Sequence, residues 1–238
     1  MMTVCRRGSG VERRLENDWG FMRRLIMSVL LTCAASNAAV SLAYAQEDTS
    51  IYGTYGVSFQ PSQVGGELKG CTLVYRAVQA DHAYLRGKPV VIVGNIGVQQ
   101  FGGSLLLTLK IGVKDLTGNQ DIVRPNFAYL QTKTKSTAKV KQVGSDGDEG
   151  YRLFAYSLYD SSVLELFKEM TDSRKVTIGF NRKRDGMDVL VPVDLDVIDA
   201  EYPGGDRVVR KRSNATLEKF LDCFSTLVEQ AKSSLDKK

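Results

Sequence analysis

Few residues of this 238-residue chain have the types and spacing that catalysis requires. His82 is the only histidine, and it follows Asp81 in a turn-like segment between two expected strands. A Ser-His-Asp hydrolase would have to use this ring, because the histidine takes the proton from the nucleophile. The chain contains no G-x-S-x-G nucleophile elbow. We therefore interpret His82 as a solvated loop residue and expect no catalytic residue and no enzyme activity.

Metal and cofactor chemistry have equally little support. After residue 45, one histidine and two widely separated cysteines remain, and these cannot assemble a zinc site of the usual kind. Asp146–Glu149 offers oxygen ligands but lacks the spacing of an EF-hand loop, which favours a hydrophilic hairpin loop. Asp188, Asp194 and Asp196 share one face of an expected strand, where solvated acids are commoner than a cation site. The sequence predicts neither a metal nor a cofactor.

Basic residues gather in short clusters that could form a binding surface for an anionic partner. If the clusters converged, they would suit lipopolysaccharide, phospholipid or an acidic protein. A charge run is more often a solvated face, so convergence is the feature to test. The candidate patch consists of Arg182, Lys183, Arg184, Arg207, Arg210, Lys211 and Arg212.

The N-terminus has the pattern of a secretory signal peptide. Arg23 and Arg24 precede the apolar run 25–31, and an A-x-A site ends at Ala45. This pattern predicts cleavage after Ala45 and a periplasmic or secreted protein; an uncleaved anchor and a lipoprotein are the alternatives. Either Met1 or Met22 could be the start. Residues 1–45 hold six of the 32 basic and three of the 27 acidic residues, so the remainder carries a net charge of +2. Such a balance gives no reason to expect nucleic acid as a partner.

Residues 46–238 are expected to fold as one domain with two cysteines. In an oxidising compartment, Cys71 and Cys223 would form one disulfide, and two free buried thiols are the alternative. The bond would fasten an amphipathic helix of about 18 residues, capped by Ser213 or Asn214, to a sheet.

Alternating apolar residues predict a mainly β fold. The clearest pattern is Met187–Val197, where every second residue is apolar and Pro192 favours an edge position. Ser162 and Glu165 form a capping-box pattern at the start of a short internal helix, Ser161–Met170. The expected fold is an antiparallel β-sandwich with this helix and the C-terminal one. Further strands are expected at 51–59, 71–78, 89–96, 104–111, 126–131, 137–143, 150–158 and 175–180, with a loop at 60–70.

The region Gly70–Val197 resembles the invasion-associated locus B family of periplasmic bacterial proteins. That resemblance implies a one-domain β fold behind a signal peptide and a part in host-cell colonisation, but no enzyme activity. The family's additional cysteines are missing here. The similarity lies in Cys71-Thr72-Leu73, Leu105–Val113, Ser161–Phe167, Lys175–Phe180 and Val189–Val197.

Two functions follow as expectations. The first is a non-enzymatic periplasmic protein that binds an envelope component or another periplasmic protein. The second is a small-ligand or lipid carrier with a pocket between the sheets or under the C-terminal helix. Under either function, we expect that the protein is not an integral membrane protein once the signal peptide is cleaved. The sequence does not define an oligomeric state.

Overall fold

The computed structural model describes residues 46–48, 50–117, 121–146, 150–201 and 207–235. Within these ranges the chain is mainly β, with antiparallel sheets and two helices, as the sequence predicts. The expected signal peptide, residues 1–45, lies outside the described residues. Neither helix of the described ranges has both the length and the apolar character needed to cross a bilayer.

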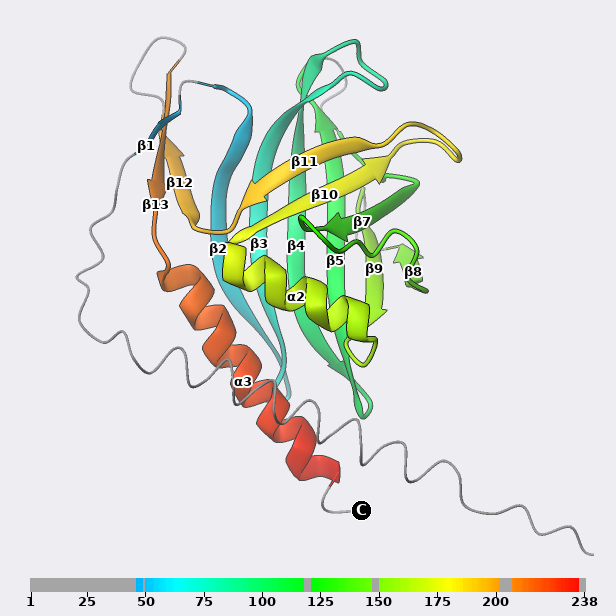
Figure 1. Cartoon of the computed structure of the whole chain (residues 1–238), viewed down its shortest axis with the longest axis vertical. Coiled ribbons are helices and arrows are strands. Elements are labelled where there is room, and N and C mark those ends of the chain that lie inside the picture. Colours follow the sequence, from blue (N-terminus) through cyan, green and yellow to red (C-terminus); the bar gives the residue numbers. More distant parts are fainter. Residues whose placement is uncertain (1–45, 49, 118–120, 147–149, 202–206, 236–238) are drawn as a thin grey trace, which may run out of the picture. The chain divides into compact units, whose positions relative to one another are not determined.

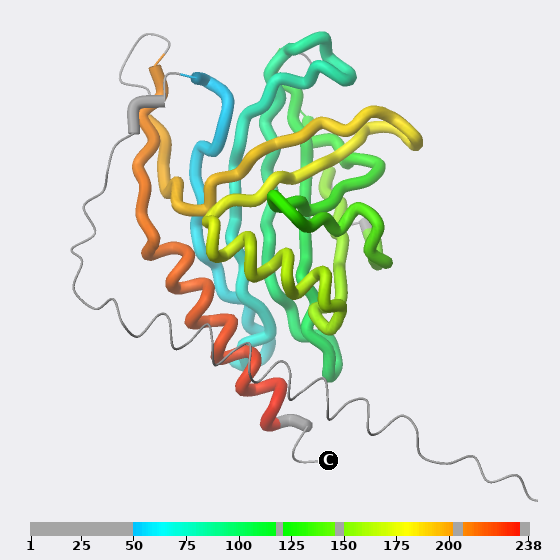
Figure 2. The backbone as a smooth tube through the Cα atoms, in the orientation of Figure 1, coloured from blue at the N-terminus to red at the C-terminus, as the bar shows by residue number. Residues whose placement is uncertain are grey.

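The largest sheet begins with long hairpins that follow one another along the chain, and it runs from blue to green in Figure 2. Its strand order is β2-β3-β4-β5-β9-β8, with β6 paired to β5. The strands are β2 (Gly53–Val64), β3 (Glu67–Asp81), β4 (Lys88–Phe101), β5 (Ser104–Asp115), β6 (Ile122–Val123), β8 (Val143–Asp146) and β9 (Arg152–Ser157).

A smaller sheet and both helices cover one face of the large sheet (Figure 1). The small sheet has the order β11-β10-β7, and a third sheet, β1-β13-β12, flanks β2. This two-layer arrangement confirms the sandwich-like fold. The bounds are β1 (Gln46–Asp48), β7 (Phe127–Gln131), α2 (Ser161–Ser173), β10 (Lys175–Asn181), β11 (Val189–Asp194), β12 (Val197–Glu201), β13 (Val208–Arg212) and α3 (Ala215–Leu235).

The core lies between the large sheet and this covering layer. Side chains that alternate along a strand point to opposite faces, and here one set is fully buried. The Phe167 ring of α2 packs 4.9 Å from the Phe224 ring of α3, centre to centre. The buried set includes Leu73, Ile96, Leu107, Leu109, Val163, Leu166, Ile178, Phe180, Val191, Val193, Leu217, Phe220 and Leu227.

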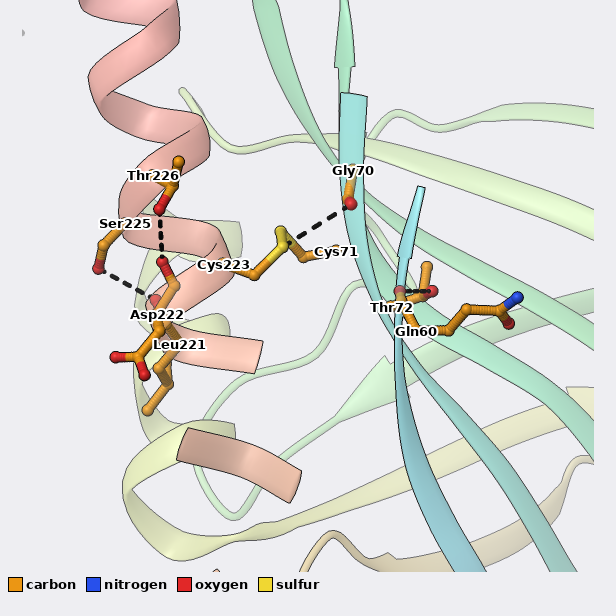
Figure 3. The surroundings of a disulfide bond; sticks show 9 residues. All are labelled: Gln60, Gly70, Cys71, Thr72, Leu221, Asp222, Cys223, Ser225 and Thr226. Atoms are coloured by element: carbon orange, nitrogen blue, oxygen red, sulfur yellow. Dashed lines mark hydrogen bonds between the residues drawn. A yellow bond between two sulfur atoms is a disulfide. The ribbon is translucent and has the colours of Figure 1, made fainter. Parts of the chain in front are cut away.

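A disulfide joins α3 to the large sheet, as predicted. Cys71 of β3 and Cys223 of α3 are bonded, with their Cα atoms 6.0 Å apart (Figure 3). Cys71 is fully buried and Cys223 is half-buried. The alternative of two free thiols is therefore wrong.

Met187–Val197 is not one strand. It forms β11 and β12, which belong to different sheets and are separated by a turn at Leu195 and Asp196. The alternating pattern continues through the turn because Leu195 and Val197 remain fully buried, whereas Met187 is 67% exposed. The predicted edge position of Pro192 is confirmed, since β11 ends the small sheet.

Three local predictions are also wrong. The expected loop 60–70 is strand apart from a turn at Gly65 and Gly66, both with positive φ, which glycine tolerates. The expected strand 137–143 is irregular chain that reaches β8 only at its end. The first turn of α2 is capped by Asp160, whose carboxylate accepts from the Ser162 backbone N–H at 2.9 Å.

Candidate functional site

An open depression of about 470 Å³ lies on the face of the large sheet that points away from α3. Cys71 marks the covered face because it is bonded to α3, and Val74 points the other way. Strand register places Ser58, Val74, Asn95 and Lys110 in one row across β2, β3, β4 and β5. We call this depression the outer-face groove.

Glycines allow the two walls of the outer-face groove to lie close to its floor. On the β2 side, a Cβ added at Gly56 would come within 3.3 Å of the Ile198 carbonyl oxygen of β12. On the β5 side, a Cβ at Gly112 would lie 3.1 Å from the Tyr151 ring. A larger residue at either position would push its wall away from the sheet.

The groove presents charges of both signs. Arg76 is exposed on β3, one step along the sheet from Val74. Lys110 is half-buried, and its Nζ lies 4.8 Å from the centre of the Tyr151 ring, a cation–π arrangement. Asp199 of β12 is exposed, and its carboxylate accepts from the Ala200 N–H at 2.9 Å. The groove can therefore contact both donors and acceptors of a ligand.

Tyr75 lies beneath the floor of the outer-face groove and has a structural role. Its hydroxyl donates to the Lys110 carbonyl oxygen at 3.2 Å. Burial, with a smaller contribution from Tyr151, raises the pKa of Tyr75 far above its ordinary range. The phenol therefore stays protonated at neutral pH and cannot act as a base.

Arg182 of the candidate anionic-partner patch is engaged within the fold. Its Nε lies 3.1 Å from Oδ2 of the fully buried Asp81, and its Nη2 lies 2.7 Å from Oδ1 of Asp115. These ion pairs connect the turn after β10 to the ends of β3 and β5. Lys183 and Arg184, which follow Arg182, are exposed.

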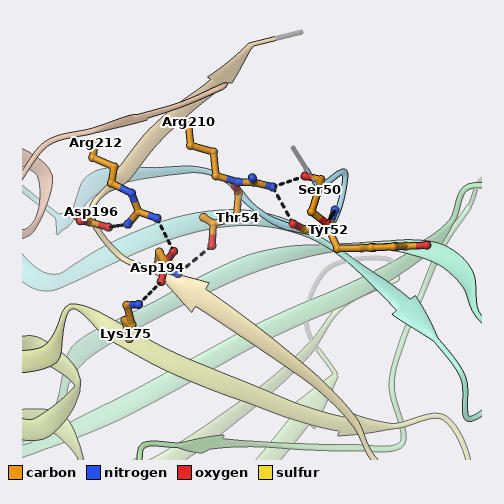
Figure 4. A network of polar contacts seen from close by, with 8 residues as sticks. All are labelled: Ser50, Tyr52, Thr54, Lys175, Asp194, Asp196, Arg210 and Arg212. Atoms are coloured by element: carbon orange, nitrogen blue, oxygen red, sulfur yellow. Dashed lines mark hydrogen bonds and ion pairs between the residues drawn. The ribbon is translucent and has the colours of Figure 1, made fainter. Parts of the chain in front are cut away.

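Arg210 is 2% exposed and binds backbone (Figure 4). Its Nε donates to the Thr54 carbonyl at 2.8 Å, and its Nη2 donates to the carbonyls of Ser50 and Tyr52 at 3.1 and 2.8 Å. A buried guanidinium with these partners stabilises the start of β2 against β13 and is not available to an external anion.

The remaining residues of that cluster divide between internal and exposed positions. Arg212 pairs with Asp194 at 2.8 Å and with Asp196 at 2.6 Å. Lys211 pairs with Glu201 on the neighbouring strand, and Arg207 is exposed. Arg212 thus forms ion pairs with two of the three aspartates that we considered as a cation site.

The structure does not bring the seven basic residues together. Arg182 follows β10, whereas Arg212 contacts Asp194 at the opposite end of the β10–β11 hairpin. Six residues of strand separate these ends, about 20 Å at about 3.4 Å per residue. Lys183 and Arg184 thus lie at one end of the hairpin and Arg212 at the other, while Arg207 precedes the far end of β13.

The described residues offer no support for catalytic or metal chemistry at the positions considered. His82 is exposed in the turn between β3 and β4, and its neighbour Asp81 is committed to Arg182. Asp188 accepts from the Tyr129 hydroxyl at 2.9 Å and from the Asn181 amide at 3.2 Å. Among the described residues, no group of three or more His, Cys, Asp or Glu could hold a metal ion. Residues 147–149 of the acidic loop lie outside the described ranges.

Sequence reasoning missed the outer-face groove. The clearest signal is Asn95, a polar residue inside the otherwise apolar run of β4, and Arg76 and Lys110 are charged residues inside β3 and β5. An amide in the middle of a central strand indicates that one face of the sheet is not packed. The partners of Asn95 across the sheet follow only from the register.

No protein-family model, no curated protein and no solved structure matches this chain.

Proposed function

We propose that this chain is an exported, non-enzymatic binding protein that holds an envelope component or a periplasmic protein in the outer-face groove. The observation that carries the proposal is the asymmetry of the large sheet. One face is largely buried under α2, α3 and the small sheet, while the other presents a groove with half-buried and exposed polar side chains. A sheet face that is hollowed and lined by polar groups has no role in the core and suits ligand contact.

The chemistry of the groove supports binding over catalysis. A nucleophile needs an adjacent base that is itself oriented by a third group. Ser58, the hydroxyl in the central row, has Val74 opposite it on β3, and the chain's single histidine lies in the β3–β4 turn. Tyr75, the phenol under the floor, keeps its proton. The groove therefore offers hydrogen-bond partners and no oriented nucleophile–base pair among the described residues.

Two features support export. The N-terminal pattern ends in Ala43-Tyr44-Ala45, as a signal peptidase site does. The Cys71–Cys223 disulfide suits an oxidising compartment, since such bonds are rare where thiols are kept reduced.

No observation favours the alternative of a lipid carrier. The outer-face groove is open and partly polar, and a second depression of about 350 Å³ lies on the surface of α2 and is lined by charged residues such as Glu165 and Lys168. A lipid carrier would need an enclosed apolar cavity.

A binding assay with envelope fractions tests the proposed function. The purified protein is mixed with sacculi, membrane vesicles and soluble periplasm of a Gram-negative bacterium, and bound material is quantified. The variant Arg76→Ala/Asn95→Ala is expected to lose binding to one fraction. The matched control Lys183→Ala/Arg184→Ala, which changes two exposed residues away from the groove, should bind like the wild type. Equal binding by both variants would overturn the proposal.

A further inference from the structure

We propose that the ligand of the outer-face groove is an oligosaccharide. This inference rests on the proposed function and specifies its ligand class. Sugars present pairs of hydroxyls at the ring edge and patches of C–H on the ring faces. A site for them needs polar side chains with two hydrogen-bonding atoms in one plane, next to exposed apolar surface.

Planar polar groups reach the groove from four different strands. Gln60 on β2, Arg76 on β3, Asn95 on β4 and Asp199 on β12 all line it. Their head groups are an amide, a guanidinium, a second amide and a carboxylate, each able to contact two neighbouring oxygens. Gln60, Arg76 and Asp199 are exposed and Asn95 is half-buried, so these side chains stand at the groove surface.

Apolar side chains lie between these polar groups. Val74 and Val93 are half-buried on the floor, and Ile198 on the β12 wall is 40% exposed. Register puts Val74 directly opposite Asn95, and Arg76 opposite Val93. Asn95 and Arg76 therefore each have an aliphatic neighbour on the adjacent strand, so polar and apolar contacts alternate across the floor.

The backbone of the floor argues against a peptide strand as the ligand. β3, β4 and β5 are paired on both sides, so their N–H and C=O groups are already used in the sheet. A peptide that extends a sheet needs a free edge. At the β2 margin, β12 lies against Gly56. Recognition in the groove therefore depends on side chains, as it does for a ligand without a peptide backbone.

The charge balance argues against a polyanion. Arg76 and Lys110 are opposed by Asp199 in the same groove, so two cations and one carboxylate give a net charge of only +1. A nucleic acid or a highly phosphorylated chain is bound through many phosphate contacts with Lys and Arg, which a net charge of +1 does not provide. A neutral or weakly charged glycan meets no such penalty.

Calorimetric titration of the purified protein tests the inference, with two probes: chitotetraose, and soluble glycan strands released from bacterial peptidoglycan. Binding of at least one probe is expected. Asn95→Ala and Asp199→Asn should each weaken it about tenfold, the effect of losing a good hydrogen bond to a ligand. Asp199 is exposed, so Asp199→Asn tests the site without disturbing the core. Arg184→Gln, far from the groove, is the matched control and should bind like the wild type. Melting temperatures of all variants are compared to verify folding.

Each result decides between distinct conclusions. Binding that both groove variants weaken and the control does not supports the oligosaccharide. Absence of binding to both probes overturns it, as does binding that the groove variants leave unchanged. If groove substitutions abolish capture of vesicles or of a periplasmic protein while neither glycan binds, the ligand class is wrong and the proposed function stands. If groove substitutions affect no capture at all, both proposals fail.

Discussion

Removing the disulfide is the sharpest test of how the fold is stabilised. The bond joins residues 152 positions apart, so cleaving it releases a loop that spans most of the described chain. In the chain-entropy description, closing such a loop stabilises the folded state by about 5 kcal/mol through the unfolded ensemble. A domain of this size loses about 2–4 °C in Tm per kcal/mol, so the Tm should fall by about 10–20 °C.

The variant Cys223→Ser is suited to this measurement. Residue 223 is half-buried, so it tolerates a serine hydroxyl better than the fully buried residue 71 does. Thermal unfolding is followed by circular dichroism under oxidising conditions. The double variant Cys71→Ala/Cys223→Ser controls for a reactive free thiol.

Reductant provides the internal check. It should lower the Tm of the wild type to near that of the variants and leave the variants unchanged. If, without reductant, the wild-type Tm lies within about 2 °C of the variants, the argument that loop closure supplies the stability is refuted.

Three further predictions concern the buried arginine, the tyrosines and the N-terminus. Arg210→Met should lower the free energy of unfolding by about 3 kcal/mol or more, because backbone carbonyls lose a buried donor, while Arg207→Met should change little; urea unfolding measures both. Burial, with the Asp188 contact at Tyr129, raises the pKa of Tyr129 and of Tyr156 to about 12. Since the phenol in the unfolded chain ionises near pH 10, the contribution of these two tyrosines to stability is complete below that pH and is lost as the pH rises toward 12. Alkaline titration of tyrosinate absorbance, with parallel urea unfolding, measures this loss. Ionisation of both tyrosines at the ordinary pKa would contradict the prediction. Protein secreted through a bacterial inner membrane should begin at Gln46, and N-terminal sequencing that finds the leader intact would contradict cleavage.

Alternating patterns predicted the long strands well, since β3, β4 and β5 each bury every second side chain on one face. The same patterns misplaced the breaks. Pro61 and the glycines suggested a loop, but β2 is the edge of the large sheet, where a missing N–H is tolerated. Apolar residues continue to alternate with polar ones through the turn at Leu195. The local pattern therefore gives no sign that β11 and β12 belong to different sheets.

The candidate site was harder to predict than the fold. Its floor depends on which residues of β2 to β5 stand opposite one another, and the β2–β3 register shifts at Gly56. A shift of one residue exchanges the two faces of a strand, so the groove cannot be assembled from composition or spacing. Charge clusters were equally misleading, because Arg182 and Arg210 have partners far away in the sequence, and Arg212 pairs with an acid in another sheet.

The contacts of Arg210 have a consequence for the order of folding. The first described residues of the domain, around Ser50 and Tyr52, depend on a side chain from β13, and β1 itself pairs with β13. When the chain leaves a ribosome or a translocation channel amino end first, β1 therefore has no pairing partner until β13 has also emerged, near the end of the chain. Premature release of a chain truncated before residue 207 would leave that strand unpaired and open to association with other molecules.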